Sequence, residues 1–215
     1  MVMVDDCYSP RVEALGATWR AWGEIGGSLT EAQWSTGTRC SGWDVACLYA
    51  HHSRVPWRWS VWPPRAPESP SGRPLTAIEV LRSYNSPGGV ASTAAPAVAS
   101  AAVAEAAQHA RVEFVERFTV LAPTVIGQLR TAEPDYVMAQ PAVDAGMTLR
   151  EVLRIVVMEA TVHLLDVQRA LDLDPAVPDA ALAETSRLLG EVAPAVGLIE
   201  AATGRSTESP FPVVR

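Results

Sequence analysis

Hydrophobic residues recur at helical spacing near the start of the chain. Over residues 12–25, Leu15, Trp19 and Trp22 fall on one side of a predicted helix. The glycines at 26 and 27 are expected to end this helix, because glycine is a poor helix former. The stretch 28–42 that follows is polar and irregular.

A second helix is predicted after Asp44, whose carboxylate can cap the first free backbone amides. Apolar positions continue to Val55, and Pro56 is expected to kink or end the helix because proline lacks the amide donor. Between 63 and 74, five of twelve residues are proline, which indicates a stiff loop. A short helix is expected over 75–84.

An alanine-rich stretch follows and predicts a long helix over 97–130, since alanine has the highest helix propensity. Bulky side chains enter at Phe114, Phe118 and Leu121, so the second half of this helix is expected to pack in the core. Pro123 can kink it.

The clearest helical pattern covers 149–171, with Thr148 as its cap. One stripe of this helix carries Leu149, Val152, Leu153, Val156, Glu159, His163, Asp166 and Ala170. A loop is expected over 134–146, a shorter helix over 180–192 and a last turn over 198–203. Strand patterns are few, so the sequence predicts an all-α protein with four main helices and a helical tail.

Composition narrows the function classes. The net charge of −7 argues against nucleic-acid binding, which needs a basic face. All 17 basic residues are arginine, which excludes Schiff-base and phosphate-loop lysines. Three cysteines without a CxxC pair fit a reduced, intracellular protein. No uninterrupted apolar run reaches the roughly 18 residues of a membrane helix. We therefore expect a cytoplasmic protein, monomer or homodimer, that acts on a small molecule and contacts neither nucleic acid nor membrane.

Three polar residues interrupt the apolar stripe of the helix at 149–171. Glu159, His163 and Asp166 are spaced by four and three positions and therefore share one face. A carboxylate and an imidazole on an apolar face are costly unless they are paired or coordinated. A metal ion would satisfy both, and a Glu–His hydrogen bond on a half-exposed face is an equally good interpretation.

A further ligand is expected on the helix after Asp44, where His51 and His52 point about 100° apart. Two imidazoles and one carboxylate form a three-ligand zinc set that leaves room for water or substrate. Asp166 is then best interpreted as the group that fixes the ring of His163.

Other candidate residues carry weaker signals. Cys47 could serve as a fourth ligand or a nucleophile, but a small buried core residue is the better interpretation. His109 has no obvious partner and is expected to be solvated. Arg54 and Arg58 could receive carboxylates, although solvation at the surface explains them equally well. The tryptophans at the end of the second helix could line a pocket mouth or simply pack together: Trp57, Trp59 and Trp62.

Two sequence blocks resemble a known family. The segment from Leu29-Thr30-Glu31 through Cys40-Ser41-Gly42-Trp43-Asp44-Val45 to Ala50-His51, and the Glu-x3-His-x2-Asp pattern from Glu159 to Asp166, are similar to the DinB-like superfamily. More narrowly, they look like the mycothiol-dependent maleylpyruvate isomerase family, in which a histidine follows the Gly-Trp pair by eight residues. The tail from Ala202 to Pro212 also resembles shorter relatives.

The resemblance implies a four-helix bundle over 1–178 and a helical C-terminal extension over 179–215 packed on it. It also implies His51, Glu159 and His163 as ligands of a divalent metal, with zinc favoured, and favours His51 over His52. Mycothiol, a low-molecular-weight thiol, would be the co-substrate. The implied reactions are thiol S-transfer to an electrophile or isomerisation through a thiol adduct.

The chain departs from the family in three ways. Many relatives carry an acidic residue at the position of Cys47. The proline-rich and alanine-rich stretches look like an insertion, and 179–215 is too short for the C-terminal domain of the full-length isomerases. Two alternatives therefore stay open: a metal-dependent biosynthetic enzyme that uses no thiol, and a non-catalytic helical binding module.

Overall fold

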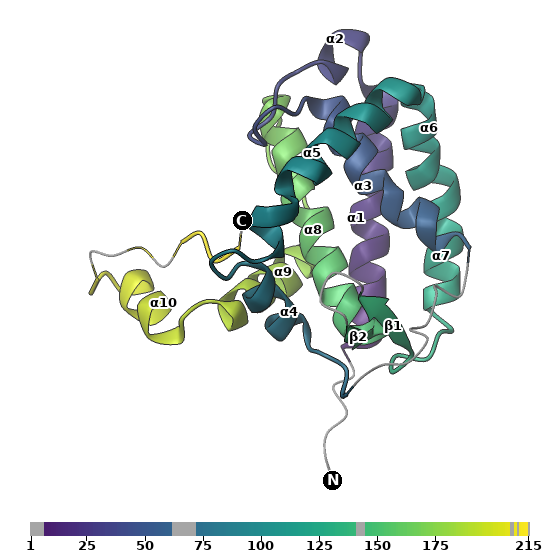
Figure 1. Ribbon diagram of the computed structural model, residues 1–215. Helices are drawn as coiled ribbons and strands as arrows, with labels where there is room; N and C mark the ends of the chain where they lie inside the picture. The colour runs from purple at the N-terminus through teal and green to yellow at the C-terminus, as the bar shows by residue number, and fades with distance from the viewer. Residues whose placement is uncertain (1–6, 62–71, 141–144, 207–208, 210, 215) are drawn as a thin grey trace.

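The computed structural model describes residues 7–61, 72–140, 145–206, 209 and 211–214, and these are mostly helical (Figure 1). In chain order the elements are α1 (Tyr8–Ser28), α2 (Glu31–Trp34), α3 (Val45–Trp59), α4 (Ala77–Tyr84), α5 (Val90–Gln108), α6 (Arg111–Glu116), the π-helix η1 (Arg117–Leu121), α7 (Ala122–Leu129), β1 (Val137–Gln140), β2 (Ala145–Thr148), α8 (Leu149–Ala170), α9 (Asp179–Val192) and α10 (Ala195–Ala202). The expected all-α class is confirmed.

The core lies where α1 packs against α8 on one side and against the continuous rod of α6, η1 and α7 on the other. α3 packs against η1 and α8, so these long helices run alongside one another (Figure 1). The largest fully buried side chains come from all of them: Trp19, Trp22, Tyr49, Phe114, Phe118 and Leu153. The apolar stripes identified in the sequence are therefore the faces that meet in this core.

The first helix continues past the glycines that were expected to end it. α1 runs to Ser28, and a Cβ atom built on Gly26 would lie 2.8 Å from Cε1 of Tyr49. Tyr49 also donates a hydrogen bond of 2.9 Å to the carbonyl oxygen of Trp22. Gly26 thus permits the close approach of α3 to α1, and this packing outweighs its low helix propensity.

The single long helix predicted over 97–130 is wrong, because the chain breaks at its middle. His109 and Ala110 are extended, with ψ angles of 145° and 146°. The carboxylate of Glu113 accepts hydrogen bonds from the Ala110 amide at 2.8 Å and from the His109 ring at 2.9 Å. These bonds cap the new helix α6, and they give His109 the partner that the sequence did not reveal.

Pro56 and Pro123 do not end the helices in which they lie. α3 continues through Pro56 to Trp59. Before Pro123 the rod widens into the π-helix η1, which shifts the carbonyl that would clash with the proline ring.

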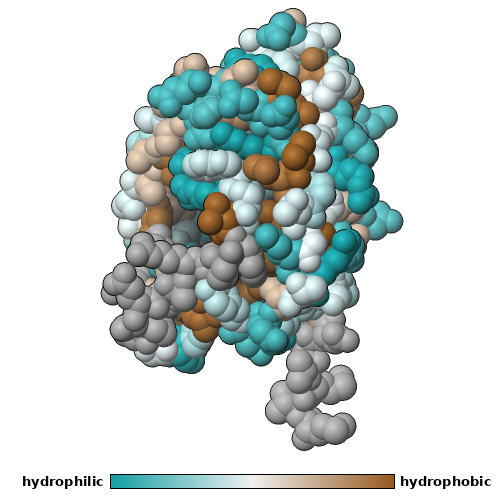
Figure 2. All heavy atoms as spheres, turned by 90° about the vertical axis from the view of Figure 1, so that its right-hand side faces the viewer, coloured by the Kyte–Doolittle hydropathy of each residue, from teal (hydrophilic) through white to brown (hydrophobic). Residues whose placement is uncertain are grey.

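The face of the molecule that carries α6 and α7 mixes hydrophobic and hydrophilic residues (Figure 2), and Val112 and Val120 are exposed on this rod.

Part of the loop expected over 134–146 is a β-hairpin. β1 and β2 pair antiparallel, with Val137 opposite Thr148 and Gln140 opposite Ala145. The buried side chains of Met138 and Met147 attach the hairpin to the base of α8. The strands are only four residues long, too short for the alternation of polar and apolar residues to be recognised.

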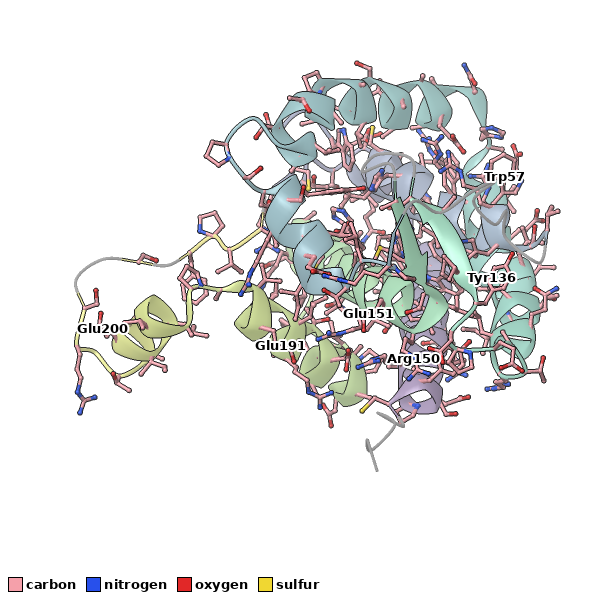
Figure 3. All side chains as sticks on the ribbon, turned by 60° about the horizontal axis from the view of Figure 1, so that its bottom comes forward. Trp57, Tyr136, Arg150, Glu151, Glu191 and Glu200 are labelled. Atoms are coloured by element: carbon pink, nitrogen blue, oxygen red, sulfur yellow. The ribbon has the colours of Figure 1, made fainter. Side chains whose placement is uncertain are left out.

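The C-terminal segment has two parts with different packing. α9 packs against α8, α1 and α4, and Arg11 and Arg154 both pair with Glu184, at 2.8 and 3.3 Å. α10, by contrast, has no buried residue and projects from the body, with Glu200 far from the core (Figures 1 and 3). The division into 1–178 and 179–215 stays a prediction.

α5 lies against α3 and is largely exposed, with only Ala102 and Ala106 buried. By length and composition it could cross a membrane: its apolar window has a mean hydropathy of 1.3 and is 6% buried. Core helices of soluble proteins and signal sequences can have the same length and apolar composition, so these properties alone do not show a membrane span. The expected absence of membrane contact therefore remains a prediction. The proline-rich stretch of 63–74 lies mostly outside the described residues, as does Trp62.

One carboxylate of α5 forms ion pairs with arginines of the helices beside it. Glu105, the one charged residue of α5, pairs with Arg117 at 2.7 Å and with Arg54 at 3.5 Å. The side chain of Arg117 is only 8% exposed. Without Glu105 it would therefore lose a hydrogen-bond acceptor that water cannot easily replace.

Replacing Glu105 with alanine is therefore expected to loosen α5. Amide hydrogen exchange over 90–108 should become about tenfold faster or more, because a buried charged hydrogen bond contributes about 1–3 kcal/mol. Glu116→Ala on the exposed face of α6 is the matched control and should leave exchange in α5 unchanged. Equal protection of α5 in both variants would contradict this role of Glu105.

Candidate metal centre

The candidate ligands come from α3 and α8, two helices that pack against each other. Asp44 caps α3 by accepting a 2.8 Å hydrogen bond from the Cys47 amide, as the sequence predicts, and His51 follows two turns later. α8 runs from Leu149 to Ala170, close to its predicted bounds. Glu159 and His163 stand one turn apart on the face of α8 that meets α3.

The structure brings His51, Glu159 and His163 together. Their candidate ligand atoms all lie within 4.8 Å of one another. Nε2 of His163 is 3.5 Å from Oε2 of Glu159, and the two imidazole rings lie 5.4 Å apart at 87°. The Trp43 ring is tilted against both imidazoles, with its centroid 5.0 Å from that of His51 and 6.3 Å from that of His163. Two nitrogens and one oxygen therefore form one cluster of candidate ligand atoms.

Asp166 contacts the opposite side of the His163 ring. Its Oδ2 lies 3.0 Å from Nδ1 of His163, so this carboxylate holds the ring with Nε2 directed to Glu159. Arg39 donates two hydrogen bonds to Oδ1, of 2.6 Å from Nη2 and 3.1 Å from Nε. The Cys40 thiol lies 3.6 Å from Oδ2, and Cys40, His163 and Asp166 form a second cluster of candidate ligand atoms.

Burial and the neighbouring charged groups set the protonation of the two imidazoles differently. Burial, together with the nearby His163, lowers the pKa of His51 to about 4, so His51 is neutral at pH 7. Burial also acts to lower the pKa of His163, but its bonds to Asp166, Cys40 and Glu159 outweigh this and raise its pKa well above the usual value. Despite burial, His163 and Arg39 hold the pKa of Asp166 below its usual range.

His52 points away from this centre into the core. Its Nε2 accepts a 3.3 Å hydrogen bond from the indole of Trp19, and its ring stacks on Trp22 and Phe118 at 4.9 and 5.7 Å. Burial lowers its pKa well below the usual value, so it stays neutral. The two adjacent histidines thus have separate places, one in the site and one in the packing.

Cys47 is buried at 6% exposure and is absent from both ligand clusters found in the described parts of the chain. Burial, with help from the Asp44 carboxylate, raises the pKa of its thiol to about 11, which makes it a poor nucleophile at neutral pH. Trp57 is half exposed and Trp59 is buried, and neither of them lines a pocket with His51 and Glu159.

A pocket of about 460 Å³ opens beside the three candidate ligands. His51 and Glu159 form part of its wall, and α5 supplies three small apolar side chains, Ala97, Val98 and Ala101. Arg54 and Arg58 line it from the later turns of α3. The volume is within the range of small-molecule sites.

Sequence reasoning did not assign Arg39, Cys40 or Trp43 a role in the site. All three lie in the irregular segment between α2 and α3, where no periodicity indicates which side chains point inward. The contact of this segment with α8 appears only in the folded structure, because Arg39 and Asp166 are 127 positions apart in the sequence.

Comparison with known proteins gives one match. A family model described as the mycothiol maleylpyruvate isomerase N-terminal domain matches residues 15–168. No curated protein and no solved structure matches the chain. The matched range contains all three candidate metal ligands and Asp166.

Proposed function

Because the chain belongs to the mycothiol maleylpyruvate isomerase N-terminal domain family, we propose that it is a metal-dependent enzyme that joins a thiol to an electrophilic small molecule. The thiol is mycothiol, and the reaction is S-transfer or, as the second choice, isomerisation through a thiol adduct. The convergence of His51, Glu159 and His163 within 4.8 Å is the observation that carries the proposal.

These residues fit a divalent metal ion. Two imidazoles and one carboxylate are a common zinc set, and three protein ligands leave a position for substrate. His51 is neutral at pH 7 and can offer a lone pair without losing a proton. Asp166 fixes His163 through Nδ1, as carboxylates commonly do for metal-binding histidines. We propose zinc as the metal and His51, Glu159 and His163 as its ligands.

The chemistry that a divalent ion supplies here is to lower the pKa of a bound thiol, so that the thiolate is present at neutral pH. The other contributions come from the chain itself. Asp166 keeps the His163 ring in place, and Trp43 lies against both imidazoles from the side of the loop before α3. The pocket beside His51 and Glu159 holds the electrophile, and the side chains of α5 exclude water from one wall.

In S-transfer the thiolate forms a bond to an electrophilic carbon of the substrate, and the leaving group departs with the bonding electron pair. We further propose that α1, α3, the α6–η1–α7 rod and α8 form the DinB-like four-helix bundle. The extension over 179–215 then packs on the bundle through α9, while α10 projects from it.

A thiol-dependence assay tests the function. Purified protein is incubated with an electrophile such as 1-chloro-2,4-dinitrobenzene and with mycothiol, glutathione or no thiol, and adducts are measured by mass spectrometry. We expect adduct formation above the uncatalysed rate with mycothiol and its loss in Glu159→Ala. Turnover of an added substrate without any thiol would support the thiol-free enzyme instead. No turnover by metal-loaded protein over an electrophile panel would favour a binding module.

Replacing Asp166 with asparagine is expected to weaken zinc binding by about 10–100-fold, the usual effect of losing a carboxylate that supports a metal-bound histidine. The asparagine has nearly the same shape but lacks the negative charge that holds the His163 ring and pairs with Arg39. Competition with a chromophoric chelator measures the affinity. Asp135→Asn, at a side chain that is 77% exposed, is the control; equal affinities in both variants would show that Asp166 does not act on the metal.

A further inference from the structure

Two arginines stand next to the proposed metal ligands without a place in the proposed reaction. Arg54 and Arg58 follow His51 on α3 by three and seven positions, so all three share one side of the helix. Both line the same pocket as His51 and Glu159.

The hydrogen-bonding capacity of Arg54 is not used up by its neighbours. Nε of Arg54 is buried and has no hydrogen-bond partner, although the Glu105 carboxylate lies 3.5 Å away. That carboxylate makes its shorter contact, of 2.7 Å, with Arg117. A buried guanidinium donor without a partner is costly, so Glu105 does not saturate Arg54, and the guanidinium group remains able to bind a ligand oxygen in the pocket that it lines.

The rest of the pocket limits the ligand. Val55, Ala97, Val98 and Ala101 are small and apolar, so they accept a short hydrocarbon body. At 1.5 Å per residue, Arg54 and Arg58 lie about 4.5 Å and about 10.5 Å along α3 from His51. A ligand that reaches the metal ligands with one end therefore presents its other end to the guanidinium groups.

We propose that Arg54 and Arg58 form a carboxylate-binding subsite, which selects electrophiles that carry a carboxylate several ångströms from the reacting carbon. The planar guanidinium fork matches a carboxylate and forms charge-assisted hydrogen bonds to it. The inference rests on the proposed function, because it assigns the substrate class of the same site. Arg54 and Arg58 orient the substrate and take no part in bond formation.

Calorimetric titration with trans-cinnamate and its uncharged analogue cinnamamide tests the subsite. We expect the protein as purified to bind cinnamate at least tenfold more tightly than cinnamamide. Arg58→Gln, which leaves the Glu105 contacts intact, should lower cinnamate affinity about five- to tenfold and leave cinnamamide binding unchanged. Arg54→Gln should act in the same direction, and Arg169→Gln at the exposed end of α8 is the matched control.

Two results would overturn the subsite: equal affinity for the two probes, or a preference for cinnamate that survives in both arginine variants, as direct binding to the metal would give. Metal content and S-transfer to 1-chloro-2,4-dinitrobenzene are measured on the same samples. Thiol transfer without a carboxylate preference refutes the subsite alone. An arginine-dependent preference for cinnamate without thiol transfer refutes the proposed reaction and keeps the subsite.

Discussion

Changing His163 to alanine is expected to remove the bound metal. The parent protein should hold about one equivalent of zinc after reconstitution, and the variant should lose affinity by more than the roughly 100-fold that a supporting residue contributes. The reason is geometric, because His163 faces Glu159 with Nε2 and Asp166 with Nδ1. Elemental mass spectrometry of dialysed, untagged protein measures the effect, and His51→Ala and Glu159→Ala should behave alike.

The adjacent His52 offers a stringent control. His52→Gln changes the imidazole next to His51. Because the His52 ring packs in the core, this variant should keep its metal content near one equivalent.

Because the carboxylates raise the pKa of His163, a proton competes with the metal for this imidazole. Bound metal should therefore be released as the pH falls and should rebind as the pH rises. Stoichiometric metal in all three alanine variants would mean that other residues are the ligands.

Changing Trp22 to alanine is expected to lower the free energy of unfolding by about 3–5 kcal/mol, the range for removing a buried aromatic side chain. Trp22 is fully buried, donates a 3.0 Å hydrogen bond to the carbonyl oxygen of Ala160 on α8, and stacks on Phe118 and His52. The variant thus loses contacts between α1, α3, η1 and α8 at once. Chemical denaturation followed by circular dichroism measures the change.

Trp57→Ala serves as the comparison for this core change. Trp57 is 49% exposed, and its specific contact is with the guanidinium of Arg117, 5.3 Å from the ring centre. Such exposed contacts contribute about 0.5–1 kcal/mol. A loss from Trp22→Ala no larger than that from Trp57→Ala would show that the long helices do not depend on this tryptophan.

Periodicity predicted the helices whose apolar stripes become buried faces. α8 and α9 have nearly the predicted bounds, because their stripes and flanking residues act in the same direction. The errors arise where a specific side-chain contact, distant or local, overrides the helix propensity of the residue. Gly26 is helical because Tyr49 packs against it, and the break at His109 depends on the side-chain cap from Glu113. No count of local propensities contains either contact.

The candidate site was likewise predicted only in part from the sequence. Spacing on α8 placed Glu159, His163 and Asp166 on one face, and the structure shows the expected contact between His163 and Asp166. Neither spacing nor periodicity selected His51 over His52; the family resemblance did, and the structure places His51 among the candidate ligands. The contacts of Arg39, Cys40 and Trp43 with the site depend on how a loop lies over α8, which the sequence pattern does not encode.

The hydrogen bonds between Arg39 and Asp166 close a loop of 127 residues around the site. The candidate ligands themselves come from opposite halves of the chain, so the unfolded chain contains no preformed copy of the centre. Zinc bound at the proposed centre would therefore link metal binding to folding: at 100 times its dissociation constant it would add about 2.7 kcal/mol to the stability of the native state. The melting temperature should then report how much zinc is bound, and a cell short of zinc would contain a less stable protein as well as a less active one.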